Sequence, residues 1–147
     1  RLVPEFEAPV YIAWSAQNRS PLIRVPAARG NGTRIELRSA DPSANPDLAL
    51  AVTIAAGLDG GKRGLTPPPA VDGNIYAMTA AQRKKQKIGS LPASLEEALI
   101  ELQKDKLVCD TLGSHVLEKF VEAKQLEWLE YKTRVSQWEI DKYLSKY

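Results

Sequence analysis

The first 40 residues concentrate one type of cationic side chain. They contain no lysine and six arginines, Arg1, Arg19, Arg24, Arg29, Arg34 and Arg38. A guanidinium group is planar and permanently charged, and it donates paired hydrogen bonds to carboxylate or phosphate oxygens in a way that a lysine ammonium cannot reproduce. The bias therefore favours binding of an anionic substrate, although arginines that coat solvated strand faces and loops would give the same composition.

Arg34, Glu36 and Arg38 are separated by single residues within 33–39. In a strand this spacing places all three side chains on one face, about 7 Å apart. Two flanking guanidinium groups would keep the Glu36 carboxylate ionised. Such a carboxylate can ligate Mg²⁺ or Mn²⁺ while the arginines hold phosphate or carboxylate groups. A self-neutralising, solvated strand face explains the spacing equally well.

The remaining reactive residues carry weaker signals. Glu5 and Glu7 lie in a proline-flanked loop, where a carboxylate could act as a mobile general base or remain a surface charge. Cys109 and His115 lack partners at the spacing of a metal site or a catalytic triad, so we expect structural roles. The basic cluster at 83–87 has no aromatic platform for nucleic acid, which favours a solvated loop or helix end.

The elements that position these residues form an α+β pattern. We expect two to four mainly antiparallel strands over 8–39, packed against helices that dominate the second half. A helix over 46–59, with Asn45 as its N-cap, is apolar nearly all round and is predicted to be buried on several sides. A loop-rich linker is expected over 62–92 and a helical region over 94–147. The individual strands expected are Ala8–Ser15, Leu22–Ala27 and Thr33–Ser39, and Asp59-Gly60-Gly61 is expected to end the apolar helix.

Composition sets broad limits. With 147 residues, 44% of them hydrophobic, and a net charge of +2, the chain fits one globular domain and gives no indication of nucleic-acid or membrane partners. One cysteine excludes an internal disulfide framework. Without a signal peptide or a membrane-spanning run, we predict a cytoplasmic protein. Strand-like sequence begins at Arg1, so we expect a chain cut from something longer.

Several motifs occur together in the first 42 residues. They are Arg1-Leu2-Val3-Pro4, Glu7-Ala8-Pro9, Trp14-Ser15-Ala16-Gln17-Asn18-Arg19-Ser20, Ile23-Arg24-Val25-Pro26 and Arg34-Ile35-Glu36-Leu37-Arg38-Ser39-Ala40-Asp41-Pro42. Later motifs are Ala44-Asn45-Pro46, Ala56-Gly57-Leu58-Asp59-Gly60, Asn74-Ile75-Tyr76 and Ser94-Leu95-Glu96-Glu97-Ala98-Leu99. This combination resembles the C-terminal catalytic segment of bacterial type I glutamine synthetase, in particular its Gram-positive, feedback-regulated branch, over essentially the whole chain.

The resemblance implies an ATP-dependent condensation of glutamate with ammonia through γ-glutamyl phosphate. The residues that it implies in glutamate binding are Arg1, Glu7, Arg19 and Arg38, and those implied in ATP binding are Arg19, Arg24 and Arg34. Glu7, Arg19 and Arg38 are the implied catalytic residues, with Glu7 resembling the flap glutamate that covers the intermediate and helps to take a proton from ammonium. Glu36 resembles a carboxylate ligand of Mg²⁺ or Mn²⁺ beside the ATP phosphates.

The family's enzyme is about three times longer and forms a double-ring dodecamer with sites between neighbouring subunits. We therefore expect that this chain alone makes no glutamine, and that one edge of its sheet has lost its neighbour. The alternative is a non-catalytic assembly or regulator-binding module. The family's C-terminal helices reach into the opposite ring, nitrogen-response regulators dock in that region, and the apolar tail Trp138–Tyr147 favours a contact role.

Four positions depart from the family pattern. They are Glu5, Asp47, Gly61 and Gly73, where the family has glycine, tyrosine, isoleucine and arginine. A side chain at position 5 restricts backbone angles that glycine would permit, so closure of the flap or feedback by glutamine is expected to change. Tyr76 aligns with the tyrosine that is adenylylated in other branches, and we expect it to be unmodified in this one.

Overall fold

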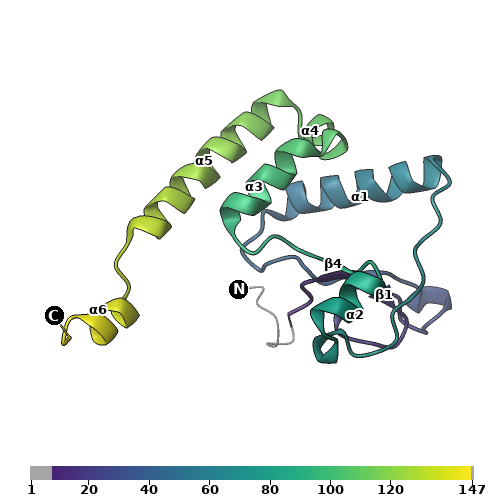
Figure 1. Ribbon diagram of the computed structural model, residues 1–147. Coiled ribbons are helices and arrows are strands. Elements are labelled where there is room, and N and C mark those ends of the chain that lie inside the picture. Colours follow the sequence, from purple (N-terminus) through teal and green to yellow (C-terminus); the bar gives the residue numbers. More distant parts are fainter. Residues whose placement is uncertain (1–7, 147) are drawn as a thin grey trace. The chain divides into compact units, whose positions relative to one another are not determined.

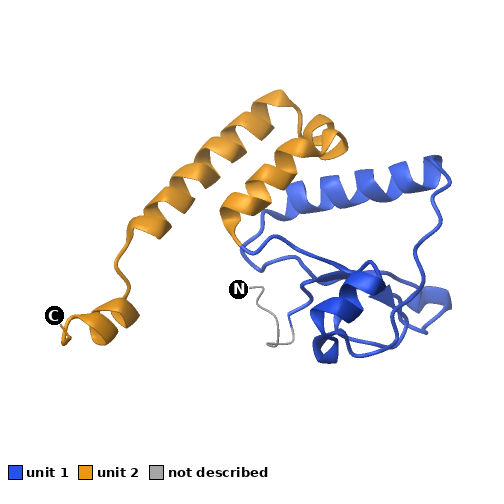
Figure 2. Cartoon of the chain, viewed as in Figure 1, with its two compact units in different colours: residues 1–93 blue, residues 94–147 orange. Residues whose placement is uncertain are grey.

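We describe the protein from a computed structural model, in which residues 8–146 are placed (Figure 1). The chain divides into two compact units, Arg1–Ala93 and Ser94–Tyr147 (Figure 2), where composition had suggested a single domain. All the strands of the described residues belong to the first unit, and helices dominate the second half of the chain. The predicted α+β class is confirmed.

The first unit contains a four-stranded sheet of order β3-β2-β1-β4. Its strands are β1 (Tyr11–Ser15), β2 (Pro21–Arg24), β3 (Glu36–Leu37) and β4 (Gly89–Ser90). The β2–β3 and β1–β4 pairs are antiparallel, as expected for most of the sheet, whereas β1 and β2 run parallel. β4 lies in the segment predicted as a linker, because a two-residue Gly-Ser strand carries no signal of its own.

A small core lies beneath this sheet. Its buried hydrophobic residues are Val10, Tyr11 and Ile75, and Ile75 is fully inaccessible. Ile75 opens a single 3-10 turn, Ile75–Ala77, within the predicted linker. The Tyr11 ring lies 5.8 Å from that of Tyr76, and the guanidinium of Arg83 lies 5.0 Å above the Tyr11 ring. These contacts attach the 71–88 region to β1.

The same segment carries the helix α2 (Ala80–Lys85). Thr79 and Gln82 cap this helix reciprocally through side chain and backbone. Its last turn contains Arg83, Lys84 and Lys85, which confirms the interpretation of the basic cluster as a helix end. The loop-rich linker predicted over 62–92 therefore contains a short helix in its second half.

The helix α1 (Pro46–Lys62) begins as predicted, because the Asn45 side chain accepts hydrogen bonds from the backbone N–H groups of Asp47 and Leu48. It does not end at Gly60-Gly61. Gly64, at φ +60°, ends it instead, since a positive φ without a Cβ lets the N–H of Leu65 return to the carbonyl of Gly60.

The predicted burial of α1 is wrong for the described residues. None of its residues is buried, and Leu50, Ile54 and Leu58 are 60%, 58% and 59% exposed. These residues are four apart and form one apolar stripe along the helix. A helix that is apolar all round needs partners on several sides, and residues 8–146 do not supply them.

The second unit contains α3 (Leu95–Lys104), α4 (Lys106–Leu112), α5 (Ser114–Thr133) and α6 (Gln137–Tyr143). Helices occupy most of the region over 94–147 that was predicted to be helical, and the side chain of Ser94 caps α3 by accepting from the N–H of Glu97. The short helix α4 was not distinguished within this region. Asp105, the N-cap of α4, directly follows the last residue of α3, so almost no loop connects the two helices.

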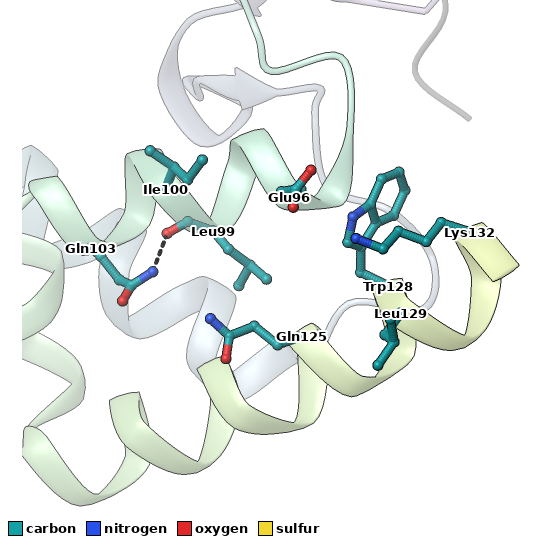
Figure 3. A pocket seen from close by; sticks show the side chains of 8 residues that line it. All are labelled: Glu96, Leu99, Ile100, Gln103, Gln125, Trp128, Leu129 and Lys132. Atoms are coloured by element: carbon teal, nitrogen blue, oxygen red, sulfur yellow. Dashed lines mark hydrogen bonds between the residues drawn. The ribbon is translucent and has the colours of Figure 1, made fainter.

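A groove of about 310 Å³ lies between α3 and α5 (Figure 3). Leu99 and Ile100 line one side, and Trp128 and Leu129 line the other. The indole N–H of Trp128 is buried without a hydrogen-bond partner among residues 8–146. Among the described residues, no helix is long and apolar enough to cross a membrane.

Candidate functional site

The most strongly charged cluster joins β2 to β3. The antiparallel register places Arg24 opposite Glu36. Nη1 of Arg24 lies 3.0 Å from Oε2 of Glu36, and Nη2 of Arg34 lies 2.7 Å from Oε1. Nε of Arg34 donates a second hydrogen bond to the same oxygen, at 2.9 Å. Glu36 is therefore held by two guanidinium groups, one at each carboxylate oxygen.

This arrangement lowers the pKa of Glu36. The largest cause is the hydrogen bonding from Arg34; partial desolvation opposes it, and the Arg24 hydrogen bond and the charges of both arginines add to the lowering. The Glu36 carboxylate is thus ionised at neutral pH, as predicted. Nε of Arg24 is buried without a partner among the described residues, so this N–H remains an unused donor beside β2.

The second arginine beside Glu36 is Arg24, where Arg38 was predicted. Regular strand geometry at β3 covers only Glu36 and Leu37, so the expected stripe over 33–39 does not form. Arg38 turns away from the carboxylate, and its Nη1 donates to the carbonyl oxygens of Arg19 and, at 3.4 Å, Pro21. Arg24 takes the place beside Glu36 because it is the cross-strand partner, a neighbour that spacing within one strand cannot reveal.

A cavity of about 350 Å³ lies beside the connection between β1 and β2. The residues that line it are Asn18, Arg19, Ser20, Arg38, Asn74 and Tyr76. Arg19 is exposed, and its guanidinium makes no hydrogen bond or ion pair with any residue of 8–146. The cavity therefore presents an uncompensated cation together with amide and hydroxyl groups, a combination suited to an anionic ligand.

The cavity residues other than the arginines were missed as site residues. Asn18 and Ser20 belong to the Asn18-Arg19-Ser20 motif, and Asn74 and Tyr76 to the Asn74-Ile75-Tyr76 motif, but none was assigned a binding or catalytic role; Tyr76 was considered only as a modification site. Asn18 and Ser20 flank Arg19, and Asn74 and Tyr76 flank the buried Ile75. These positions indicate a shared site only once the fold brings the two distant motifs together.

Tyr76 links the cavity to the start of the described chain. Its hydroxyl donates to the carbonyl oxygen of Ala8 at 2.7 Å. Ala8 directly follows Glu7, the residue expected to cover the intermediate. Arg1, Glu5 and Glu7 lie outside the described residues, so their predicted roles stay predictions.

Arg29 does not contribute to either cluster. Its Nη1 donates to the carbonyl oxygens of Pro26 at 2.7 Å and Ala28 at 2.9 Å, so it holds its own loop. Cys109 donates a long hydrogen bond of 3.3 Å to the carbonyl of Leu102, and this contact between α4 and α3 fits the structural role expected for it. His115 lies exposed in the first turn of α5.

The described residues do not form a metal site by themselves. No three histidine, cysteine, aspartate or glutamate side chains within 8–146 lie close enough to hold one ion. Both oxygens of Glu36, the predicted ligand of Mg²⁺ or Mn²⁺, are engaged by arginines. Hard divalent cations need six or more oxygen ligands, and one carboxylate supplies at most two.

A model of the catalytic domain of glutamine synthetase matches residues 1–143. The chain belongs to this family. Glutamine synthetase of Thermus thermophilus is 56% identical over 147 residues, which are 100% of this chain and 33% of that protein. The Thermotoga maritima protein of the same name is 55% identical over 98% of the chain and 33% of its own length. The Staphylococcus aureus protein is 50% identical over 100% of the chain and 33% of its own length.

A solved structure described as apo GmaS without ligand superposes with a TM-score of 0.74 at 31% sequence identity. The match covers 92% of this chain and 30% of that one. The chain thus spans about a third of the length of the relatives that it matches. The resemblance to the glutamine synthetase family is confirmed, and the narrower assignment to the Gram-positive branch stays a prediction.

Proposed function

We propose that this chain supplies the arginine-bearing part of a glutamine synthetase active site, for the ATP-dependent condensation of glutamate with ammonia. One observation carries the proposal: the guanidinium of Arg19, which has no partner among residues 8–146, lines a cavity with Arg38 in a chain of this family. The cluster around Glu36 also lies on β2 and β3 or directly beside them. One pair of strands therefore positions both this cluster and the two arginines at the cavity. We call Arg19, Arg24, Arg34 and Arg38 the arginine set.

The arginine set suits phosphoryl transfer. In the proposed reaction the side-chain carboxylate of glutamate attacks the γ-phosphorus of ATP, ADP leaves, and ammonia then displaces phosphate from γ-glutamyl phosphate. The negative charge of the transferred group is spread over three oxygens, and catalysis of such a transfer consists mainly of positioning and charge stabilisation. Arg19 and Arg38 would contact the transferred group and glutamate, while Arg24 and Arg34, and also Arg19, would contact the phosphates of ATP.

Divalent metal belongs to the proposal only in part. Glu36 would supply no more than one of several ligands, and the remaining ligands of Mg²⁺ or Mn²⁺ would have to come from outside the described residues. Within this chain, the role that the contacts of Glu36 support is orientation of Arg24 and Arg34, because each guanidinium is fixed by a charge-assisted hydrogen bond.

We further propose that the chain alone does not complete the reaction. It covers about a third of its relatives, and the apolar stripe of α1 remains exposed among the described residues. A complete site would then need the rest of the enzyme and, as in the family, a homo-oligomer in the cytoplasm.

Two proteins test these proposals together. One is the 147-residue chain, and the other is a chimera in which the chain replaces the aligned third of the Thermus thermophilus relative. Phosphate release that depends on ATP, glutamate and ammonium is expected from the chimera and not from the chain. Arg19→Lys in the chimera should lower kcat by about 100-fold, because an ammonium cannot reproduce two-point contact with phosphoryl oxygens. Turnover by the chain alone, or a fully active Arg19→Lys chimera, would contradict the proposal.

The second candidate function is an assembly or regulator-binding module. The observation that favours it is the exposed apolar surface of α6 and the residue after it, where Trp138, Tyr143 and Leu144 are 60%, 44% and 76% exposed. Light scattering of the chain distinguishes the candidates, because a module of this kind predicts a ring-sized particle or a stable complex with a nitrogen-response regulator. A 16.2 kDa monomer that binds neither would exclude it.

A further inference from the structure

The connection between β1 and β2 has an uncommon geometry. The two strands are parallel, with Tyr11 paired to Pro21 and Ser15 paired to Arg24. Parallel neighbours normally need a crossover of a dozen or more residues, whereas only residues 16–20 connect these two. The chain must return along about 13 Å of strand within that span, and among the described residues no backbone–backbone hydrogen bond forms within 16–20.

Side chains replace the missing backbone hydrogen bonds. The hydroxyl of Ser15 accepts from the N–H groups of Gln17 and Asn18 at 3.2 and 3.1 Å, and it donates to Asp72 at 3.0 Å. Oδ1 of Asn18 accepts from the N–H of Ser20 at 2.9 Å. These four hydrogen bonds hold the connection in one shape.

Three further hydrogen bonds attach the connection to the segment that follows α1. Nδ2 of Asn18 donates to the carbonyl oxygens of Gly73 and, at 3.5 Å, Val71. The N–H of Ile75 donates to the hydroxyl of Ser20 at 3.1 Å. Ser20 is 2% exposed and Ile75 is fully buried, so this attachment lies within the core of the first unit.

Between these two attached residues lies Arg19. Its carbonyl oxygen accepts from Nη1 of Arg38, so its backbone is held on three sides, while its guanidinium has no partner within 8–146. A long side chain on a rigid backbone loses less freedom when a ligand binds, and a small displacement of such a group is costly for catalysis.

We propose that Asn18 and Ser20 are positioning residues for Arg19, fixing its backbone at the cavity through their hydrogen bonds to Gly73 and Ile75. This inference deepens the proposed function and rests on it for its kinetic consequence. The hydrogen-bonded attachment itself can be tested without any activity.

The key variant is Asn18→Asp. It has the same shape and keeps Oδ1 for the N–H of Ser20, but it replaces the donor that faces the carbonyl of Gly73 with an acceptor. Asn45→Ala is the matched control, because it removes the asparagine cap of α1 and no contact of the cavity. Ser20→Ala and Ser20→Thr form a second pair, in which only threonine keeps a hydroxyl for the N–H of Ile75.

In the chimera, Asn18→Asp is expected to lower kcat about 10- to 100-fold while KM for ATP changes less than about 3-fold. If Asn18 acts through Arg19, adding Asn18→Asp to Arg19→Lys should lower kcat by no more than about 3-fold further. Ser20→Thr should recover most of the rate lost in Ser20→Ala, and Asn45→Ala should keep the wild-type rate. Independent, multiplicative losses of Asn18→Asp and Arg19→Lys would overturn the inference.

Backbone ¹⁵N relaxation of the 147-residue chain supplies the test that does not need turnover. Asn18→Asp should increase the mobility of residues 17–20, and Asn45→Ala should not. Unchanged mobility in Asn18→Asp would overturn the positioning role. A chimera without turnover would instead refute the proposed function, and the relaxation result would still decide the attachment.

Discussion

Truncation of Ile75 is expected to destabilise the first unit far more than its size suggests. Ile75 is fully buried, and apart from prolines the described residues of this unit bury only two other hydrophobic side chains, Val10 and Tyr11. Replacing a buried isoleucine by alanine typically costs about 2–5 kcal/mol, from lost transfer free energy and from the cavity that remains. In a unit of this length each kcal/mol lowers Tm by roughly 4–8 °C, so Ile75→Ala should lower Tm by at least about 8 °C.

The chain contains a matched control for this substitution. Ile54 in α1 is 58% exposed, so Ile54→Ala removes the same atoms with little loss of buried surface. Its effect should stay within about 0.5 kcal/mol, and alanine even favours the helix slightly. Ile75→Val should give an intermediate loss of about 0.5–1.5 kcal/mol, because only one methyl group is removed.

Hydrogen exchange measured by mass spectrometry is the suitable assay, because it reports peptides of the two units separately. Protection in 71–78 and in β1 should fall in Ile75→Ala and persist in Ile54→Ala. The loss should extend to the cavity, since the N–H of Ile75 holds Ser20. Equal effects of the two substitutions, or a change of less than about 2 °C in Ile75→Ala, would refute the assignment of the core to Ile75.

Three further predictions concern charge and surface. The arginines lower the pKa of Glu36, so its ionisation stabilises the fold above the pKa of a glutamate in the unfolded chain, about 4.3, and this stabilisation is lost as the pH falls further. Urea titrations should show this loss of stability at acid pH in the wild type and a smaller one in Glu36→Gln. The triple variant Leu50→Glu, Ile54→Glu and Leu58→Glu should be more soluble than the wild-type chain and should keep α1 folded. Sedimentation would measure the solubility, and circular dichroism would measure the helix content. Trp128→Phe should change the free energy of unfolding, measured by urea titration, by less than about 1 kcal/mol, because the lost indole N–H has no partner among residues 8–146; a larger loss would contradict this expectation.

Local signals predicted much of the fold. Asn45 was identified as a helix cap, and its side chain accepts the expected backbone hydrogen bonds. Caps depend on a few neighbouring residues, and the ends of helices are therefore legible where their side chains are of the right type. The end of α1 was misplaced because Gly60 and Gly61 looked equally able to stop it, and only the backbone reveals that Gly64 adopts the positive φ.

Contacts between residues on neighbouring strands could not be predicted from the sequence. The carboxylate between two guanidinium groups was predicted at Glu36, but its second partner is Arg24, twelve residues earlier, through the register of two strands. The parallel arrangement of β1 and β2 was likewise unexpected, because five connecting residues are ordinarily too few for it. In both cases the cause is a cross-strand contact that no periodicity encodes.

The two kinds of interaction in this chain respond differently to separation from the rest of an enzyme. The arginine set is held by hydrogen bonds and ion pairs between residues of the first unit, so its shape depends on contacts that this chain contains. The stripe on α1 is apolar and exposed, and hydrophobic faces are stabilised only by surfaces that cover them. Anion binding at Arg19 should therefore be retained by the chain, whereas turnover needs the groups that would face it. Phosphate binding and glutamine formation should be measured on one sample of the chain. Phosphate binding without glutamine formation would show that the arginine set is ordered although the active site is incomplete.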